Sequence, residues 1–94
     1  PMEQYKPAHG ESLLEMRARL GLFLTELMKK NKDKTVLLVT HGGSLAGLLS
    51  YILNAQGEWF TDFSHGNTGF SIVDMSDDGN HKAHVINDTS HLAL

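Results

Sequence analysis

The sequence contains no cysteine among its 94 residues. Disulfide bonds and thiolate metal sites are therefore excluded, and nothing in the composition indicates a secreted, disulfide-stabilised domain. No apolar run approaches the roughly 18 residues that a membrane span requires, and no charged-then-apolar leader opens the chain. We therefore expect neither a membrane anchor nor a signal peptide, and we expect a cytoplasmic protein.

Basic charge is also scarce. Eight Lys and Arg residues stand against eleven Asp and Glu residues, which gives a net charge of -3. Nucleic acids and anionic membranes are bound by basic surfaces, so we expect neither as a partner. The hydrophobic fraction of 40% and the charged fraction of 20% are typical of a globular chain, and the length allows one small domain at most.

The apolar pattern predicts the element order helix–strand–helix–strand–strand, which is an α/β arrangement. Ser12 and Glu15 have the spacing of a capping box, and apolar residues at three- and four-residue steps then predict an amphipathic helix of about 18 residues. Residues 35–40 are apolar on both faces, which predicts a central strand that needs neighbours on both edges. A second, largely buried helix is predicted over about 44–53. After a loop with a helical turn near 58–60, strands are predicted at 70–75 and 83–86, joined by a hairpin turn.

The turn after the first predicted strand is the best functional candidate. His41 lies at the carboxyl end of that strand, where ligands bind in open α/β sheets. Gly42 and Gly43 allow a close approach of the backbone, and their N–H groups lie at a helix N-terminus, which favours an anion. Histidine in this position can donate a hydrogen bond to a phosphate or transfer a proton. The alternative is a histidine that only caps the helix.

A second alternative uses Ser44 as the nucleophile of a serine hydrolase fragment. The strand-to-helix turn resembles a nucleophile elbow, with Asp62 or Asp88 and then His91 as later partners. Against this alternative, Ala46 replaces the last glycine of the elbow, and the sheet of such hydrolases is larger than this chain can form. The histidines do not suggest a metal site either, because no pair has the spacing of a zinc-binding helix.

Several segments, taken in order, resemble the histidine phosphatase superfamily, the phosphoglycerate-mutase-like proteins. They are Gly10-Glu11-Ser12 at a helix start, the strand from Val36 that ends in the His41-Gly42-Gly43 turn, Asn67-Thr68-Gly69-Phe70-Ser71-Ile72, and Asn87-Asp88-Thr89-Ser90-His91-Leu92. The resemblance covers the chain from Gly10 onward. It implies a three-layer α/β/α fold and a phosphatase, or a mutase, that acts on a small phosphorylated metabolite.

The resemblance also implies a mechanism. A histidine in an Arg-His-Gly motif attacks the phosphoryl group, an acid protonates the leaving oxygen, and water hydrolyses the phosphohistidine. Arginines and a second histidine neutralise the transferring group, without a metal or cofactor. His41 matches that second histidine and Gly42 the residue whose N–H faces the phosphate, with Gly43 beside it. Glu11 and Asn67 are further pocket candidates.

The family's nucleophile motif does not occur in this chain. Ala8-His9-Gly10-Glu11 resembles it, but Ala8 replaces the arginine and no strand precedes it. We therefore expect residues 1–94 to be the carboxyl-terminal half of one domain, inactive alone, whose nucleophile lies in a missing amino-terminal half. The alternative is a non-catalytic module that binds phosphate or associates with itself. The expected partners are accordingly the missing half or a second copy of the chain.

Overall fold

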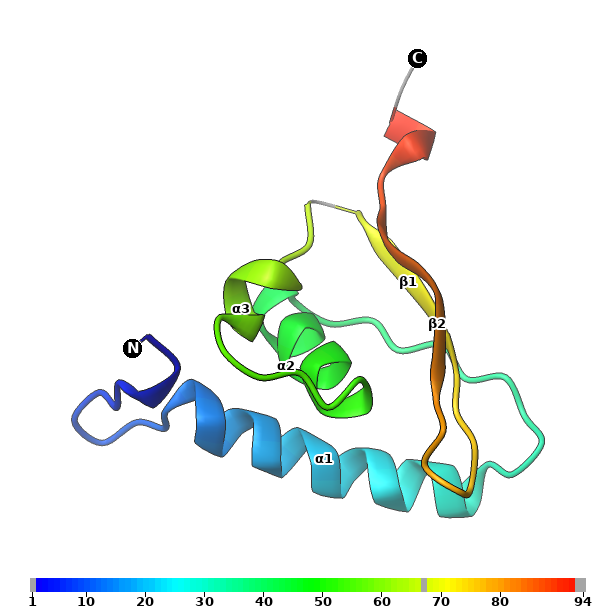
Figure 1. Ribbon diagram of the computed structural model, residues 1–94, viewed down its shortest axis with the longest axis horizontal. Coiled ribbons are helices and arrows are strands. Elements are labelled where there is room, and N and C mark those ends of the chain that lie inside the picture. The colour runs from blue at the N-terminus through cyan, green and yellow to red at the C-terminus, as the bar shows by residue number, and fades with distance from the viewer. Residues whose placement is uncertain (1, 67, 93–94) are drawn as a thin grey trace.

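The computed structural model describes residues 2–66 and 68–92. Helix α1 (Leu13–Lys30) packs against α2 (Gly42–Ile52), and the short helix α3 (Trp59–Asp62) packs against α2 in turn (Figure 1). Strands β1 (Phe70–Asp74) and β2 (Lys82–Asp88) form a two-stranded antiparallel sheet. Single 3-10 turns, η1 (Met2–Gln4) and η2 (Ser90–Leu92), lie toward the two ends. This mixture of helices and strands is compatible with the predicted α/β class.

Helix α1 begins where the capping box predicts. The Ser12 hydroxyl accepts a hydrogen bond from the Glu15 N–H at 3.1 Å, and the Glu15 carboxylate accepts one from the Ser12 N–H at 2.9 Å. The backbone hydrogen bond from Ser12 lowers the pKa of Glu15, because it stabilises the charged carboxylate. Lys29 and Lys30 in the last turn complement the negative end of the helix dipole. Local chemistry therefore specifies both ends of this helix.

Replacing Ser12 with alanine should lower the free energy of unfolding by about 1 kcal/mol, since the first-turn N–H loses its acceptor. Urea unfolding followed by far-UV circular dichroism measures the change. Thr25→Ala is the matched control in the same helix, because the Thr25 hydroxyl only donates back to the Gly21 carbonyl. Alanine is the better helix former, so Thr25→Ala should be neutral or slightly stabilising. Equal losses in both variants would contradict the role of the cap.

The core is a seam between α1 and α2. Leu20 and Leu24 from α1 meet Leu48 from α2, and all three are buried. The two helices approach closely at Gly21, where an added Cβ would lie 2.3 Å from the Tyr51 Cε2 atom. The predicted burial of the second helix is confirmed for residues 46–50. Among the helices of the described residues, none combines the length and apolarity that crossing a membrane needs.

Trp59 attaches α3 to this seam. Its side chain is 1% exposed. The Arg17 guanidinium lies 5.0 Å from the centre of the ring, within the range of a cation–π interaction, and donates a hydrogen bond to the Ala55 carbonyl at 2.8 Å. The buried Glu3 carboxylate accepts a hydrogen bond from the Phe60 N–H at 3.3 Å. Segments far apart in the sequence therefore meet at α3.

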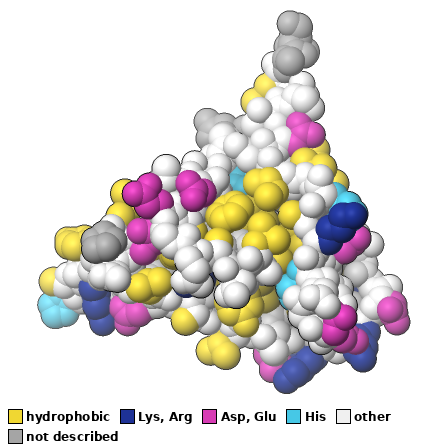
Figure 2. Space-filling model, in the orientation of Figure 1, with side chains coloured by type: hydrophobic (Ala, Val, Ile, Leu, Met, Phe, Trp, Pro, Cys, Tyr) yellow, Lys and Arg dark blue, Asp and Glu magenta, His cyan; other side chains and the backbone are white. Residues whose placement is uncertain are grey.

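The prediction of a central strand at residues 35–40 is wrong. This segment has no regular secondary structure, and within the described residues none of its backbone groups forms a hydrogen bond. Leu37 and Val39 are 86% and 87% exposed, while Leu38 packs on the core. An apolar pattern describes a preference for burial, but a strand also needs a neighbouring strand, and the hairpin strands pair with each other. Figure 2 shows hydrophobic side chains open to solvent between the helices and the hairpin.

The predicted hairpin is confirmed, although β2 extends beyond the expected residues 83–86. Val73 faces Ala83 and Asp74 faces Lys82, and the register is irregular between Phe70 and Val73. Gly79 has φ 86° in the connecting turn, as predicted for this position. The hairpin is the only sheet in the part of the chain that the structure describes.

Candidate functional site

His41 immediately precedes α2. Its backbone is extended, with φ −92° and ψ 161°, and its carbonyl accepts the first helical hydrogen bond, from the Leu45 N–H at 2.9 Å. The imidazole makes no capping hydrogen bond and is exposed. His41 therefore caps the helix through its backbone and not through its side chain, and neither ring nitrogen has a hydrogen-bond partner among the described residues.

The first turn of α2 offers backbone donors beside this ring. Within residues 2–66 and 68–92, the N–H groups of Gly42, Gly43 and Ser44 donate to no protein acceptor. Such groups carry the positive end of the helix dipole. The geometry therefore places a proton-donating or proton-accepting ring next to amides that favour an anion.

The protein's own packing does not require glycine in this turn. A Cβ at Gly42 would lie 3.6 Å from the His65 carbonyl oxygen, and one at Gly43 would lie 3.5 Å from the Phe60 ring. Both are ordinary van der Waals distances, and neither residue has the positive φ that favours glycine. The same distances show that α3 and the loop at His65 flank the first turn of α2.

A partly buried polar network holds that loop. His65 Nδ1 lies 2.9 Å from the Phe63 carbonyl oxygen, and Nε2 lies 2.7 Å from the Ser71 hydroxyl. Because a carbonyl only accepts, Nδ1 carries the proton in the neutral ring, and Ser71 donates to Nε2. The Ser71 oxygen accepts from the Asn87 N–H, and the Asn87 side chain accepts from the Gly66 N–H, both at 3.0 Å. His65 thus links the site to both strands.

The sequence does not predict this network. His65 has no motif around it, and Asn87 lies 21 residues from Gly66 along the chain. One local signal was available, namely glycine at position 69, where a Cβ would lie 2.2 Å from the Asn87 side-chain oxygen. The reason for a glycine at position 69 can be recognised only when Asn87 is known to be its neighbour.

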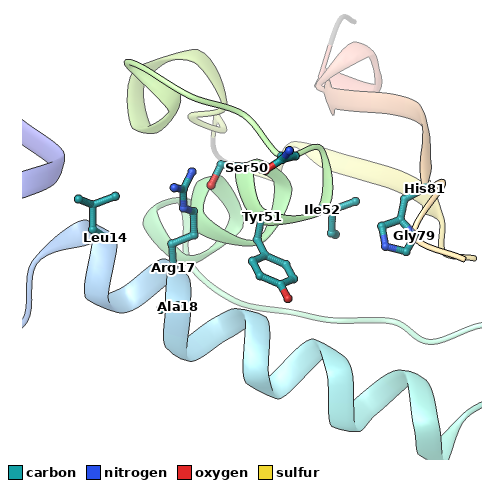
Figure 3. A pocket seen from close by; sticks show the side chains of 9 residues that line it. Leu14, Arg17, Ala18, Ser50, Tyr51, Ile52, Gly79 and His81 are labelled. Carbon is teal, nitrogen blue, oxygen red and sulfur yellow. The ribbon is translucent and has the colours of Figure 1, made fainter. Parts of the chain in front are cut away.

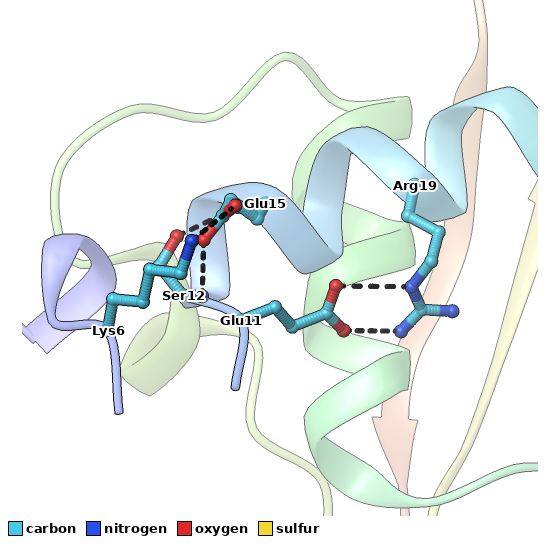
Figure 4. A network of polar contacts seen from close by, with 5 residues as sticks. All are labelled: Lys6, Glu11, Ser12, Glu15 and Arg19. Atoms are coloured by element: carbon cyan, nitrogen blue, oxygen red, sulfur yellow. Dashed lines mark hydrogen bonds and ion pairs between the residues drawn. The ribbon is translucent and has the colours of Figure 1, made fainter. Parts of the chain in front are cut away.

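Of the two remaining pocket candidates, Glu11 is engaged with another residue. Glu11 is exposed, and its carboxylate accepts two hydrogen bonds from the Arg19 guanidinium, the shorter at 2.7 Å (Figure 4). The Arg19 hydrogen bond lowers the pKa of Glu11, so this group is an ion-pair partner at the start of α1. Asn67 lies outside the described residues.

The structure does not assemble the serine-hydrolase alternative. Among the described residues, the Ser44 hydroxyl forms no hydrogen bond with Asp62, Asp88 or His91. His91 Nε2 lies 2.9 Å from the Thr68 hydroxyl, and the Asp88 carboxylate accepts the Ser90 N–H, which lowers the Asp88 pKa.

In the part of the chain that the structure describes, no three His, Asp or Glu side chains cluster as metal ligands would. His84 pairs with Asp74 on the hairpin, and His81 Nδ1 accepts the Ser76 N–H at 2.9 Å. These two histidines are therefore engaged within the hairpin.

A cavity among the described residues lies away from His41. It measures about 590 Å³ and opens between α1, the carboxyl-terminal half of α2 and the hairpin turn (Figure 3). Tyr51 and Arg17 project into it from the two helices, and His81 lies at its far side. None of the predicted site residues lines it, so the candidate site is a surface turn and not a closed pocket.

Comparison with known proteins gives one match. The family model described as the histidine phosphatase superfamily (branch 1) matches residues 1–89. No curated protein and no solved structure matches the chain.

Proposed function

The chain belongs to the histidine phosphatase superfamily, and on that premise we propose that it forms part of a phosphatase acting on small phosphate monoesters. Membership of this superfamily supports phosphatase or mutase activity in general. The narrower proposal is that these residues supply the second active-site histidine, His41, and the amides that face the phosphate.

One observation supports the proposal. The His41 imidazole lies beside the backbone amides of Gly42 and Gly43, and among the described residues neither the ring nor these amides form hydrogen bonds. A phosphoryl group transferred to or from a histidine carries negative charge on its equatorial oxygens, and preorganised donors stabilise that charge. The absence of a steric need for glycine at 42 and 43 agrees with a backbone that a ligand approaches.

The proposed reaction proceeds in two steps. A nucleophilic histidine outside these residues forms a bond to phosphorus while the ester oxygen leaves and takes a proton from an acid. Water then attacks the phosphohistidine and releases inorganic phosphate. Throughout, His41 donates one N–H to a non-bridging oxygen, and the Gly42 and Gly43 amides donate to the same group. The chemistry as proposed uses no metal or cofactor.

We further propose that residues 1–94 are the carboxyl-terminal portion of a three-layer α/β/α domain. The exposed apolar segment at 35–40 supports this, because residues with that pattern usually lie inside a sheet. The nucleophile and the phosphate-binding arginines would then lie in an amino-terminal portion. The only arginines of this chain are engaged elsewhere, Arg17 with Ala55 and Trp59 and Arg19 with Glu11.

The test is a titration of the 15N-labelled chain with inorganic phosphate at constant ionic strength. We expect saturable shifts in the Gly42, Gly43 and Ser44 amide resonances and weaker binding by His41→Ala. The matched control His84→Gln, which changes an exposed histidine on β2, should bind phosphate as the parent chain does. The chain alone should hydrolyse p-nitrophenyl phosphate no faster than buffer. Shifts confined to other regions, or turnover by the chain alone, would overturn the proposal.

A further inference from the structure

The two flanks of the first turn of α2 differ in polarity. A Cβ at Gly42 would lie 3.6 Å from the His65 carbonyl oxygen, whereas one at Gly43 would lie 3.5 and 3.8 Å from the Cε2 and Cζ atoms of the Phe60 ring. A carbonyl oxygen accepts hydrogen bonds, and covering it with an apolar group leaves it without a partner. The apolar part of a phosphate ester bound at this turn is therefore better accommodated on the Phe60 flank.

Three contacts fix the position of the Phe60 ring in advance. The Phe60 N–H donates to the buried Glu3 carboxylate at 3.3 Å, which holds the backbone. The neighbouring Trp59 side chain is buried against the Arg17 guanidinium and anchors α3. The rings of Trp59 and Phe60 meet edge to face, with their centres 6.2 Å apart and their planes at 73°. A ring that is already held loses little conformational entropy when a ligand packs on it.

Phe60 is only partly buried, so part of its ring surface remains open to solvent. Its approach to Gly43 places this apolar surface beside the amides that face the phosphate in the proposed function. Aromatic rings pair with one another in offset-stacked or edge-to-face arrangements, with their centres about 4.5–7 Å apart. We propose, on the premise of the proposed function, that Phe60 determines specificity by packing against the leaving group. The site then prefers phosphate monoesters of aromatic alcohols to those of aliphatic alcohols.

The charges around α3 decide which ester is the right probe. Glu58 and Asp62 flank Phe60 in the sequence and are exposed, and residues 58–63 contain no Lys or Arg. A leaving group with a carboxylate or a second phosphate would meet like charge there. Phenyl phosphate carries negative charge only on its phosphate oxygens, and methyl phosphate presents the same phosphate without a ring. The difference between their two affinities therefore measures the contribution of the ring.

The test is a set of titrations of the 15N-labelled chain with inorganic, methyl and phenyl phosphate at constant ionic strength. We expect all three to shift the Gly42 and Gly43 amide resonances, and phenyl phosphate to bind about three- to ten-fold more tightly than methyl phosphate. Absence of these shifts with inorganic phosphate would overturn the proposed function, and this inference with it. Shifts with inorganic phosphate, together with equal affinities for the two esters, would overturn the inference alone.

Two variants locate the contact with the leaving group. Phe60→Leu keeps an apolar side chain against α2, so it should leave the affinity for inorganic phosphate unchanged while reducing the preference for phenyl phosphate to less than about two-fold. Phe23→Leu is the matched control, a phenylalanine on α1 that is 46% exposed, and it should bind both esters as the parent chain does. Equal effects of the two variants, or an unchanged preference in Phe60→Leu, would contradict the proposal.

Nuclear Overhauser effects in the parent chain give a readout that does not depend on the stability of any variant. We expect cross-peaks between the ring protons of bound phenyl phosphate and those of Phe60. Cross-peaks from the ligand to other side chains, without any to Phe60, would overturn the assignment.

Discussion

Replacing His41 with alanine should lower the turnover of a phosphate monoester by the proposed complete domain on the order of 100-fold, the usual effect of removing one charge-stabilising donor. The variant should fold normally, since the imidazole is exposed and makes no hydrogen bond among the described residues. Loss of activity would therefore report on the transition state and not on stability. Release of inorganic phosphate from p-nitrophenyl phosphate measures it.

Two controls sharpen this experiment. His41→Asn retains an N–H donor and should keep part of the activity that alanine loses. His84→Gln changes a histidine that pairs with Asp74 on the hairpin, and it should leave turnover unchanged. Equal turnover by His41→Ala and the parent protein would refute the assigned role of His41.

Replacing Trp59 with alanine should lower the free energy of unfolding by about 3–5 kcal/mol, since it empties a large buried site. The total free energy of unfolding of a 94-residue chain is roughly 5–14 kcal/mol, so the variant loses a large share of its stability. The loss includes the contact with Arg17, which orders the chain at Ala55. Urea unfolding must be followed by far-UV circular dichroism, because Trp59 is the only tryptophan.

The matched control for Trp59→Ala is Leu22→Ala. Leu22 is a large hydrophobic residue that is 73% exposed, and its truncation should change stability by no more than about 0.5 kcal/mol. A small loss of stability in Trp59→Ala would mean that α3 is not part of the region that unfolds cooperatively.

The elements that were predicted correctly are those whose sequence signals lie within a few residues of one another. The Ser12–Glu15 capping box fixes the start of α1, and a turn glycine with alternating neighbours fixes the hairpin. The strand at 35–40 was wrong because its formation depends on a partner strand, which the local pattern does not reveal. The His65–Ser71–Asn87 network was missed for the same reason, since its members become neighbours only after the hairpin forms. His41 was placed correctly before α2, while its chemical role stays a prediction.

The hydrogen bonds at His65 join the hairpin to the loop beside α2, and we expect the hairpin to open without unfolding of the helical seam. The leucine seam joins α1 to α2, whereas the hairpin strands pair with each other and reach the His65 loop through Ser71 and Asn87. Regions with few buried contacts open at lower free energy than the core. Opening of the hairpin would release the His65 carbonyl from beside Gly42 while α2 stayed folded. Because the Gly66 N–H donates to Asn87, we expect amide exchange at Gly66 to report this opening before global unfolding occurs.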